Sequence, residues 1–238
     1  MISFSQLGKQ GRLGNQLFQI AATISTALKN NDSYAFPIWE YHDYFNLEYC
    51  FFDNIKFENI YREPFFHYNQ IQYKQNMDLL GFFQSEKYFV EHKNLIIDLL
   101  TPKENVKFEK NLCGIHVRRG DYVNNPAYIN LDMEYYNAAM NYIKADKYLI
   151  FSDDINWCKG KFIGPQFEFS YKNHVCKDLA FMSKRCNHMI IANSSFSWWG
   201  AYLNQNIDKT IIAPQKWFGP SLKMHNIKDL LPENWIKI

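Results

Sequence analysis

In the second half of this 238-residue chain, short apolar runs alternate with segments of helical periodicity, and this alternation limits the possible folds most. The runs at residues 112–117, 148–151 and 188–192 are typical of buried strands. Strands that alternate with helices predict an α/β fold with a mostly parallel sheet. In an open parallel sheet, ligands bind beyond the carboxyl ends of the strands. The residues that follow these three runs are therefore the candidate site.

The segment after the first run reads His116-Val117-Arg118-Arg119-Gly120-Asp121. Each arginine offers a fixed fork of donors that matches a phosphate or a carboxylate. Gly120 permits a sharp turn, and Asp121 can brace one arginine so that the other stays directed at a ligand. The pattern predicts an anion site, and the alternative is a solvated turn with an ordinary Arg–Asp pair.

Polar clusters also follow the other two runs: Ser152-Asp153-Asp154 after the second, and Asn193-Ser194-Ser195-Phe196-Ser197 after the third. Arginines, serine hydroxyls and the N–H groups that begin a helix suit a diphosphate. An aspartate suits the donor edge of a base or a ribose hydroxyl. Together the three clusters predict a nucleotide site. For the serines, the alternative role is helix capping alone.

The first half begins with a predicted strand at residues 2–7, a glycine-rich loop, a helix with apolar residues 17–28 on one face, and a second strand at 34–38. Such a loop exposes backbone N–H groups at a helix N-terminus, where an anion is stabilised. The glycine spacing matches neither a dinucleotide fingerprint nor a P-loop. A phosphate site and a tight turn therefore remain alternatives.

Residues 39–77 show poor periodicity and many aromatic side chains, which make up 18 % of the chain. Aromatic faces suit sugar rings, and they equally suit an irregular core. Further along, we predict a strand at 79–84 and a helix at 86–100 with Ser85 as its N-cap. Asp132 is the predicted N-cap of a helix at 133–144.

The net charge of +2 is too small to indicate a nucleic-acid surface. The five cysteines include no Cys-x-x-Cys pair and no metal-ligand spacing, which favours a reducing compartment. We find neither a signal peptide nor an apolar run long enough to span a bilayer. We therefore expect a cytoplasmic protein without a metal site.

Five segments, in order, resemble the motifs of the α1,2-fucosyltransferases of glycosyltransferase family eleven. They are GRLGNQLFQ at 11–19, GFFQSEKYF at 81–89, HVRRGD at 116–121, FSDD with WCK at 151–154 and 157–159, and NSSFSWWGA at 193–201. The resemblance implies a GT-B-like α/β fold of two Rossmann-type lobes with mostly parallel sheets. We assign residues 1–105 to an acceptor-side lobe with the glycine loop, and residues 106–238 to a GDP-fucose-binding lobe.

The resemblance also implies the activity, which is transfer of L-fucose from GDP-β-L-fucose to the 2-hydroxyl of a terminal galactose on an oligosaccharide. The reaction would be inverting and would need neither a metal ion nor a cofactor. The alternatives are a nucleotide-sugar- or glycan-binding protein without turnover, and a fucosyltransferase of another linkage. Contact with the inner face of the membrane, the natural acceptor and the oligomeric state stay open.

By similarity, the catalytic residues would be Arg118, Asn15 and Asp121. Arg118 would bind the β-phosphate with support from Arg119, and His116 would lie near the guanine, with Asp153 or Asp154 reading the base. The full set of implied donor contacts is Gly14, His116, Arg118, Arg119, Asp153, Asp154, Asn193, Ser194, Ser195, Phe196 and Ser197. The general base is left unassigned.

Overall fold

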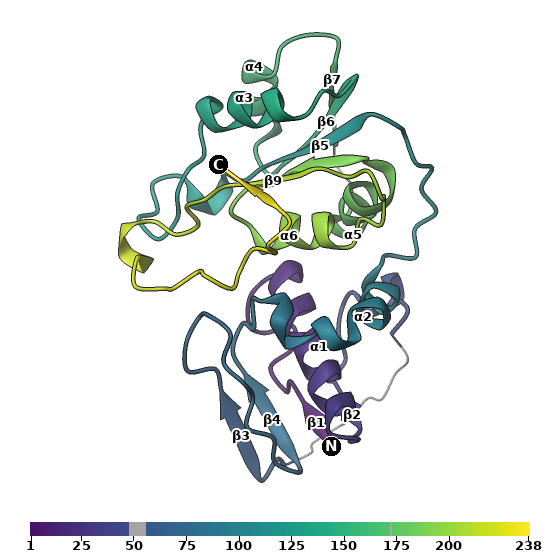
Figure 1. The fold of residues 1–238 in the computed structure, drawn as a ribbon, viewed down its shortest axis with the longest axis vertical. Helices are drawn as coiled ribbons and strands as arrows, with labels where there is room; N and C mark the ends of the chain where they lie inside the picture. The colour runs from purple at the N-terminus through teal and green to yellow at the C-terminus, as the bar shows by residue number, and fades with distance from the viewer. Residues whose placement is uncertain (48–55, 172) are drawn as a thin grey trace. The chain divides into compact units, whose positions relative to one another are not determined.

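A computed structural model describes residues 1–47, 56–171 and 173–238, so Cys50 lies outside the described residues. The chain divides into unit 1, which contains Met1–Lys103 and His225–Pro232, and unit 2, which contains Glu104–Met224 and Glu233–Ile238. Residues 225–232, which we expected in the second lobe, thus belong to unit 1. Each unit is built on a parallel sheet, which confirms the predicted α/β class (Figure 1).

Unit 1 has four strands in the order β2-β1-β4-β3, and every pairing is parallel. They are β1 (Ile2–Ser3), β2 (Tyr34–Ala35), β3 (Asn59–Arg62) and β4 (Met77–Leu80), with the helices α1 (Leu13–Lys29) and α2 (Lys93–Leu100). Strand β3 arises within residues 39–77, where periodicity predicted no element. Two of its four residues are exposed and none is buried, so the strand lacks the apolar run that identifies buried strands.

Helix α1 is buried along almost its whole length, including its polar positions. Thr23 and Thr26 satisfy their hydroxyls within the helix, by donating to the carbonyl oxygens four residues earlier at 2.7 and 2.6 Å. The helix ends at Lys29, and the side chain of its C-cap residue Asn30 donates to the Thr26 carbonyl at 2.8 Å. Asn31 then takes a left-handed conformation with φ 52°, which turns the chain towards β2.

Two predictions around residue 85 are wrong in extent. Strand β4 covers Met77–Leu80 rather than 79–84, and Phe83, with φ 52°, has a backbone conformation that excludes it from a strand. The predicted helix at 86–100 is divided into the 3₁₀ turns Glu86–Tyr88 and Val90–His92, followed by α2. The break lies at Phe89, which has φ −140° and a fully buried side chain, so packing of this ring outweighs helix propensity. Ser85 does cap the first turn, and accepts from the Lys87 N–H at 3.3 Å.

Unit 2 has six parallel strands in the order β10-β9-β8-β5-β6-β7. They are β5 (Leu112–Val117), β6 (Lys147–Ser152), β7 (Phe167–Phe169), β8 (His188–Ile190), β9 (Ile211–Ala213) and β10 (Ile236–Lys237). Counted by their appearance in unit 2, the order from β7 to β10 is 3-2-1-4-5-6. This is the order of the dinucleotide-binding doubly wound fold, and its direction reverses between β5 and β8.

Helices cover both faces of this sheet (Figure 1). One face carries α3 (Met133–Tyr142) and α4 (Ile155–Lys161), and the other carries α5 (Val175–Ala180), a π-helical turn (Phe181–Arg185) and α6 (Ser195–Tyr202). Asp132 caps α3 as predicted, and accepts from the N–H groups of Glu134 and Tyr135 at 3.0 and 3.3 Å. Helix α4 was not predicted.

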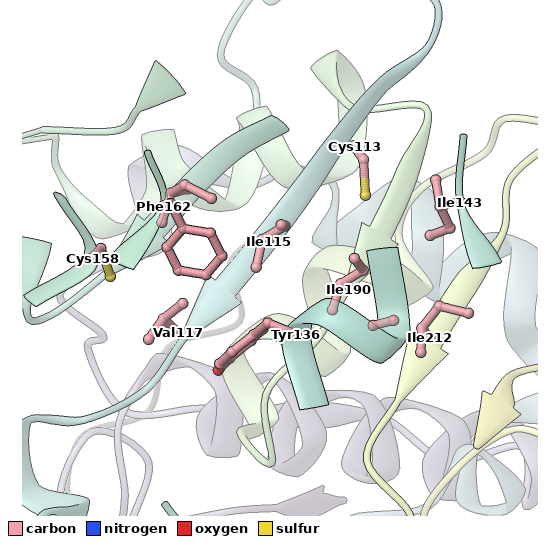
Figure 2. Packing of buried hydrophobic residues seen from close by; sticks show 11 residues of the cluster. Cys113, Ile115, Val117, Tyr136, Ile143, Cys158, Phe162, Ile190 and Ile212 are labelled. Carbon is pink, nitrogen blue, oxygen red and sulfur yellow. The ribbon is translucent and has the colours of Figure 1, made fainter. Parts of the chain in front are cut away.

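Successive residues of β5 point to opposite faces of the sheet, so the strand contributes different residues to each face. Cys113, Ile115 and Val117 join a buried cluster with Tyr136 of α3 and Phe162, which follows α4 (Figure 2). Gly114 and His116 point to the opposite face, where a Cβ at position 114 would lie 2.5 Å from the Met189 sulfur. His116 is thereby directed towards α6.

Within the described ranges, no helix has the length and apolar character needed to cross a bilayer. Cys113, Cys158, Cys176 and Cys186 are all buried. Burial raises the pKa of the Cys158 thiol to about 11, so this thiol stays protonated and unreactive near neutral pH.

Candidate active site

The polar clusters predicted after β5, β6 and β8 meet at one edge of the unit 2 sheet. Val117, at the end of β5, pairs with Ser152 at the end of β6, and Ile115 pairs with Ile190 at the end of β8. The strand order reverses between β5 and β8, so their carboxyl ends flank the crevice in which this fold binds ligands. Eleven of the thirteen predicted site residues lie in these three segments.

Arg118 is held by two carboxylates. Its Nη1 lies 2.9 Å from Oδ2 of Asp153, and its Nη2 donates to Oδ1 of Asp121. Its side chain is 15 % exposed. The two pairs use at most two of its five N–H groups, which leaves donors for a ligand. Partly exposed ion pairs add little stability, so their main effect is a fixed direction for the guanidinium.

Arg119 is anchored by different contacts. Its backbone N–H donates to Oδ1 of Asp153 at 2.9 Å, and its Nε lies 3.1 Å from Oδ2 of Asp154. The guanidinium carbon lies 4.2 Å from the ring centroid of Trp157 on α4, a cation–π distance. Asp154 also caps α4 by accepting from the Trp157 N–H at 3.1 Å. Asp153 and Asp154, expected to read the base, thus bind the two arginines.

Gly120 is required for a reason other than the predicted sharp turn. Its φ is not in the left-handed region. A Cβ built on Gly120 would lie 2.5 Å from Oδ2 of Asp153, the oxygen that binds Arg118. Any larger residue would push the Asp153 carboxylate away from the arginine.

His116 is buried and donates to, or accepts from, the Ser197 hydroxyl at 2.9 Å through its Nδ1. Burial, with a smaller contribution from the Arg118 charge, lowers the pKa of His116 to about 3. The imidazole is therefore neutral near pH 7, and it can hydrogen-bond a ligand but cannot serve as an acid there. The ring of Phe196 packs edge-on against it at 5.6 Å between centroids.

The segment after β8 contains the structural residue Asn193 and two serines at a helix N-terminus. The buried Asn193 donates to the carbonyl oxygens of Ile129 and Trp217 at 3.1 and 2.8 Å, so it ties loops together. Ser194 is the N-cap residue of α6, yet its side chain makes no capping bond. Capping alone therefore does not explain Ser194. Ser194 and Ser195 stand at the helix N-terminus, where backbone N–H groups favour an anion.

The remaining two predicted residues belong to unit 1. Gly14 is buried in the first turn of α1, and Asn15 follows it. The Asn15 Oδ1 accepts from Nε2 of Gln84 at 2.8 Å. Gly11 has φ 77°, and a Cβ on it would lie 2.4 Å from the Asn15 Nδ2, so Gly11 is required both for its conformation and for the asparagine's position.

One polar cluster on the same edge of unit 2 was not predicted from the sequence. Asp178 of α5 accepts from the Ser170 hydroxyl at 2.5 Å and from Asn173 Nδ2 at 3.1 Å, both at Oδ1. Ser170 follows β7, so the signal was the one used for the other strands, namely polar residues after a strand end. Burial raises the pKa of the Asp178 carboxyl.

Within residues 1–47, 56–171 and 173–238, no group of three or more His, Cys, Asp or Glu side chains is placed to hold a metal ion. The arrangement offers fixed arginines, a helix N-terminus and a neutral imidazole. This is a set of groups suited to a phosphorylated ligand.

The family model "Glycosyl transferase family 11" matches residues 14–238, so the chain belongs to this glycosyltransferase family. It is 32 % identical to "Alpha-1,2-colitosyltransferase" of Escherichia coli, over 96 % of each chain. It is 30 % identical to "O-antigen biosynthesis glycosyltransferase WbnK" of Escherichia coli, over 71 % of this chain and 63 % of that protein.

Two further similarities are more distant. "Galactoside 2-alpha-L-fucosyltransferase" of Caenorhabditis elegans is 27 % identical, over 66 % of this chain and 51 % of that protein. The solved structure of NodZ alpha-1,6-fucosyltransferase soaked with GDP-fucose gives a TM-score of 0.48 at 12 % identity, and covers 85 % of this chain and 91 % of that one.

The neutral His116 leads to a pH prediction. An unfolded histidine binds a proton below about pH 6.5, whereas folded His116 does so only near pH 3. Between these values each pH unit of acidification costs up to about 1.4 kcal/mol of unfolding free energy. We expect denaturant titrations to show that the unfolding free energy falls between pH 7 and pH 5.5 by roughly 1 kcal/mol less in His116→Gln than in the wild type. Equal sensitivity of the two proteins would contradict a neutral His116.

Proposed function

We propose that this glycosyltransferase moves L-fucose from GDP-β-L-fucose to the 2-hydroxyl of a terminal galactose on an oligosaccharide, with inversion and without a metal ion. The single observation that carries the proposal is the fixed Arg118, held by Asp121 and Asp153 where the strand order reverses. A diphosphate bound there would meet a guanidinium that is already oriented.

The chemistry explains why an oriented arginine matters. In the reaction the bond between fucose C1 and the β-phosphate oxygen breaks, and a bond from C1 to the acceptor oxygen forms. The bonding electrons stay on the phosphate oxygen, so negative charge grows on GDP as it leaves. Arg118 stabilises this charge more in the transition state than in the ground state, and this difference is what accelerates the reaction.

The acceptor hydroxyl must also lose its proton. We leave this general base unassigned. Asp121 is bonded to Arg118, so its proposed catalytic contribution is to position that arginine. Arg119, with its side chain on Trp157 and Asp154, is proposed to support the diphosphate, and Ser194 and Ser195 to bind it at the N-terminus of α6.

A second donor is favoured by one comparison. The relative that matches over 96 % of both chains is named a colitosyltransferase. Colitose is L-fucose that lacks the 3-hydroxyl, so the same diphosphate site would serve either nucleotide sugar. GDP-colitose is therefore the alternative donor. The name of the WbnK relative supports an O-antigen oligosaccharide as the acceptor, which would place the reaction in the cytoplasm.

A donor screen tests the function. The purified protein is incubated in EDTA with lactose and one of GDP-fucose, GDP-colitose, GDP-mannose or UDP-galactose, and products are detected by mass spectrometry. We expect a fucosylated product with an α1,2 linkage. A product from GDP-colitose alone would change the donor assignment. Binding of GDP without turnover of any donor, including slow hydrolysis, would favour the binding-protein alternative.

Arg118 provides a sharper test. A hydrogen bond to a charged group contributes about 1.5–3 kcal/mol, so Arg118→Ala should lower kcat roughly a hundredfold in a folded protein. Arg118→Lys keeps the charge but loses the forked arrangement of donors, so its kcat should lie between those of the wild type and Arg118→Ala. Lys161→Ala removes a surface cation at the end of α4 and serves as the control. Near-normal kcat in Arg118→Ala would exclude the proposed mechanism.

Asp178 is our candidate for the base-reading carboxylate, because Asp153 and Asp154 are bonded to arginines. Guanine presents two adjacent N–H donors, and a carboxylate can accept from both. The Asp178 Oδ1 accepts from Ser170 and Asn173, whereas no donor to Oδ2 is found within the described ranges. In this strand order the nucleoside side of a dinucleotide lies over the first three strands, here β5, β6 and β7.

Asp178→Asn tests this assignment, since the amide oxygen can still accept from Ser170. We expect calorimetry to show about a tenfold or greater rise in the Kd of GDP, with weak UDP binding unchanged. Asp146→Asn, at the amino end of β6, is the matched control. An unchanged preference for GDP over UDP would remove Asp178 from the base site without affecting the role of Arg118.

A further inference from the structure

Glu63 of unit 1 lies outside the five family-like segments, but it contacts the turn at the start of the second one, residues 81–84. It follows β3, and its backbone N–H donates to the Leu80 carbonyl at 2.8 Å. Its Oε2 accepts from the Phe82 N–H at 2.7 Å, and both oxygens lie 3.1 Å from the Phe83 nitrogen. The Tyr88 hydroxyl donates to Oε1 at 3.3 Å. The carboxylate thus holds the turn that follows β4.

This turn has a conformation that needs such a partner. Phe83 is fully buried with φ 52°, a left-handed backbone that L side chains adopt only at a cost. Successive N–H groups in a turn of this kind form a concavity that binds an anion. Gly81 completes the fit, since a Cβ there would lie 2.4 Å from the Cβ of Glu63.

The residue that follows Phe83 contacts Asn15 through its side chain. This residue, Gln84, is buried and donates through Nε2 to the Asn15 Oδ1 at 2.8 Å. Nearby, Gln19 donates through Nε2 to the carbonyls of Gln10 and Gly81 at 3.2 and 3.3 Å. The glycine loop, the start of α1 and the turn therefore form one hydrogen-bonded group within unit 1.

The contacts also determine how the Asn15 amide is turned. Its oxygen faces Gln84, and its nitrogen lies towards Gly11, where an added Cβ would approach it to 2.4 Å. The hydrogen bond from Gln84 therefore fixes which side of the Asn15 amide carries the oxygen and which carries the nitrogen.

We propose that Glu63 is a positioning residue for sugar transfer: it holds residues 81–84 so that Gln84 keeps the Asn15 amide in one orientation. The inference rests on the proposed function, because it assumes that Asn15 contributes to transfer. Glu63 acts through Gln84 and does not itself contact the substrates. Its oxygens already accept from two backbone N–H groups and one hydroxyl, which suits an orienting group better than a proton acceptor.

The test is a kinetic double-mutant cycle between Glu63→Gln and Asn15→Ala, with Gln84→Ala as a second variant that leaves the turn intact. Glu63→Gln keeps one acceptor oxygen and replaces the other with a donor. We expect Glu63→Gln and Gln84→Ala each to lower kcat about tenfold, with the donor KM within about twofold of the wild type. In the Asn15→Ala background, neither change should lower kcat further. Glu91→Gln, a surface carboxylate paired with Lys29, is the matched control.

A second readout is independent of turnover. In ¹⁵N spectra, the side-chain NH₂ signals of Asn15 should shift in Glu63→Gln and stay in place in Glu91→Gln. Unchanged Asn15 signals, or kcat losses that multiply with Asn15→Ala, would overturn the positioning role. A wild type that transfers no sugar would instead overturn the proposed function, and the two failures are therefore distinguishable.

Discussion

The Asp153 carboxylate is the interaction on which the candidate site depends. One of its oxygens accepts from the Arg119 backbone and the other pairs with the Arg118 side chain, so a single group sets both the path of the loop after β5 and the direction of a guanidinium. Gly120 is needed because only a residue without a Cβ leaves room for this carboxylate. The site is thus a packed arrangement of charges whose geometry is fixed before a ligand binds. Such preorganisation makes electrostatic stabilisation effective in catalysis.

Carboxylates also accept from backbone N–H groups beyond other strand ends. Glu63 accepts from the backbone after β4, and Asp78 of β4 accepts from the Ser5 backbone N–H after β1 at 2.7 Å. In each case a carboxylate on one strand or just after it binds the backbone N–H groups that follow a neighbouring strand. Segments beyond a strand have lost their ladder partners, and a buried N–H without a partner is costly. The carboxylates satisfy these groups and at the same time place the side chains around them.

Much of the site could be predicted from the sequence because its signals are local. An apolar run followed by Arg-Arg-Gly-Asp identifies a strand and its end, and parallel topology then brings such ends to one edge. The roles within the site were less predictable. Asp153 and Asp154 had the chemistry to read a base, yet they bind the arginines. Ser197 resembled a cap, yet it bonds His116. A side chain that can make several kinds of bond takes the one that its neighbours in space offer, and adjacency along the chain does not specify those neighbours.

The sequence by itself determined the α/β class, the strands β5, β6 and β8 of unit 2, the caps at Ser85 and Asp132, and the family motifs, since periodicity, capping and motif spacing are properties of short segments. Only the tertiary structure decided the strand order with its reversal between β5 and β8, the division of the predicted helix at Phe89, and the left-handed Phe83. It also decided the neutral state of His116 and the contact between Glu63 and the turn after β4. These features depend on burial and on contacts between residues far apart in the chain, where packing outweighs local preference.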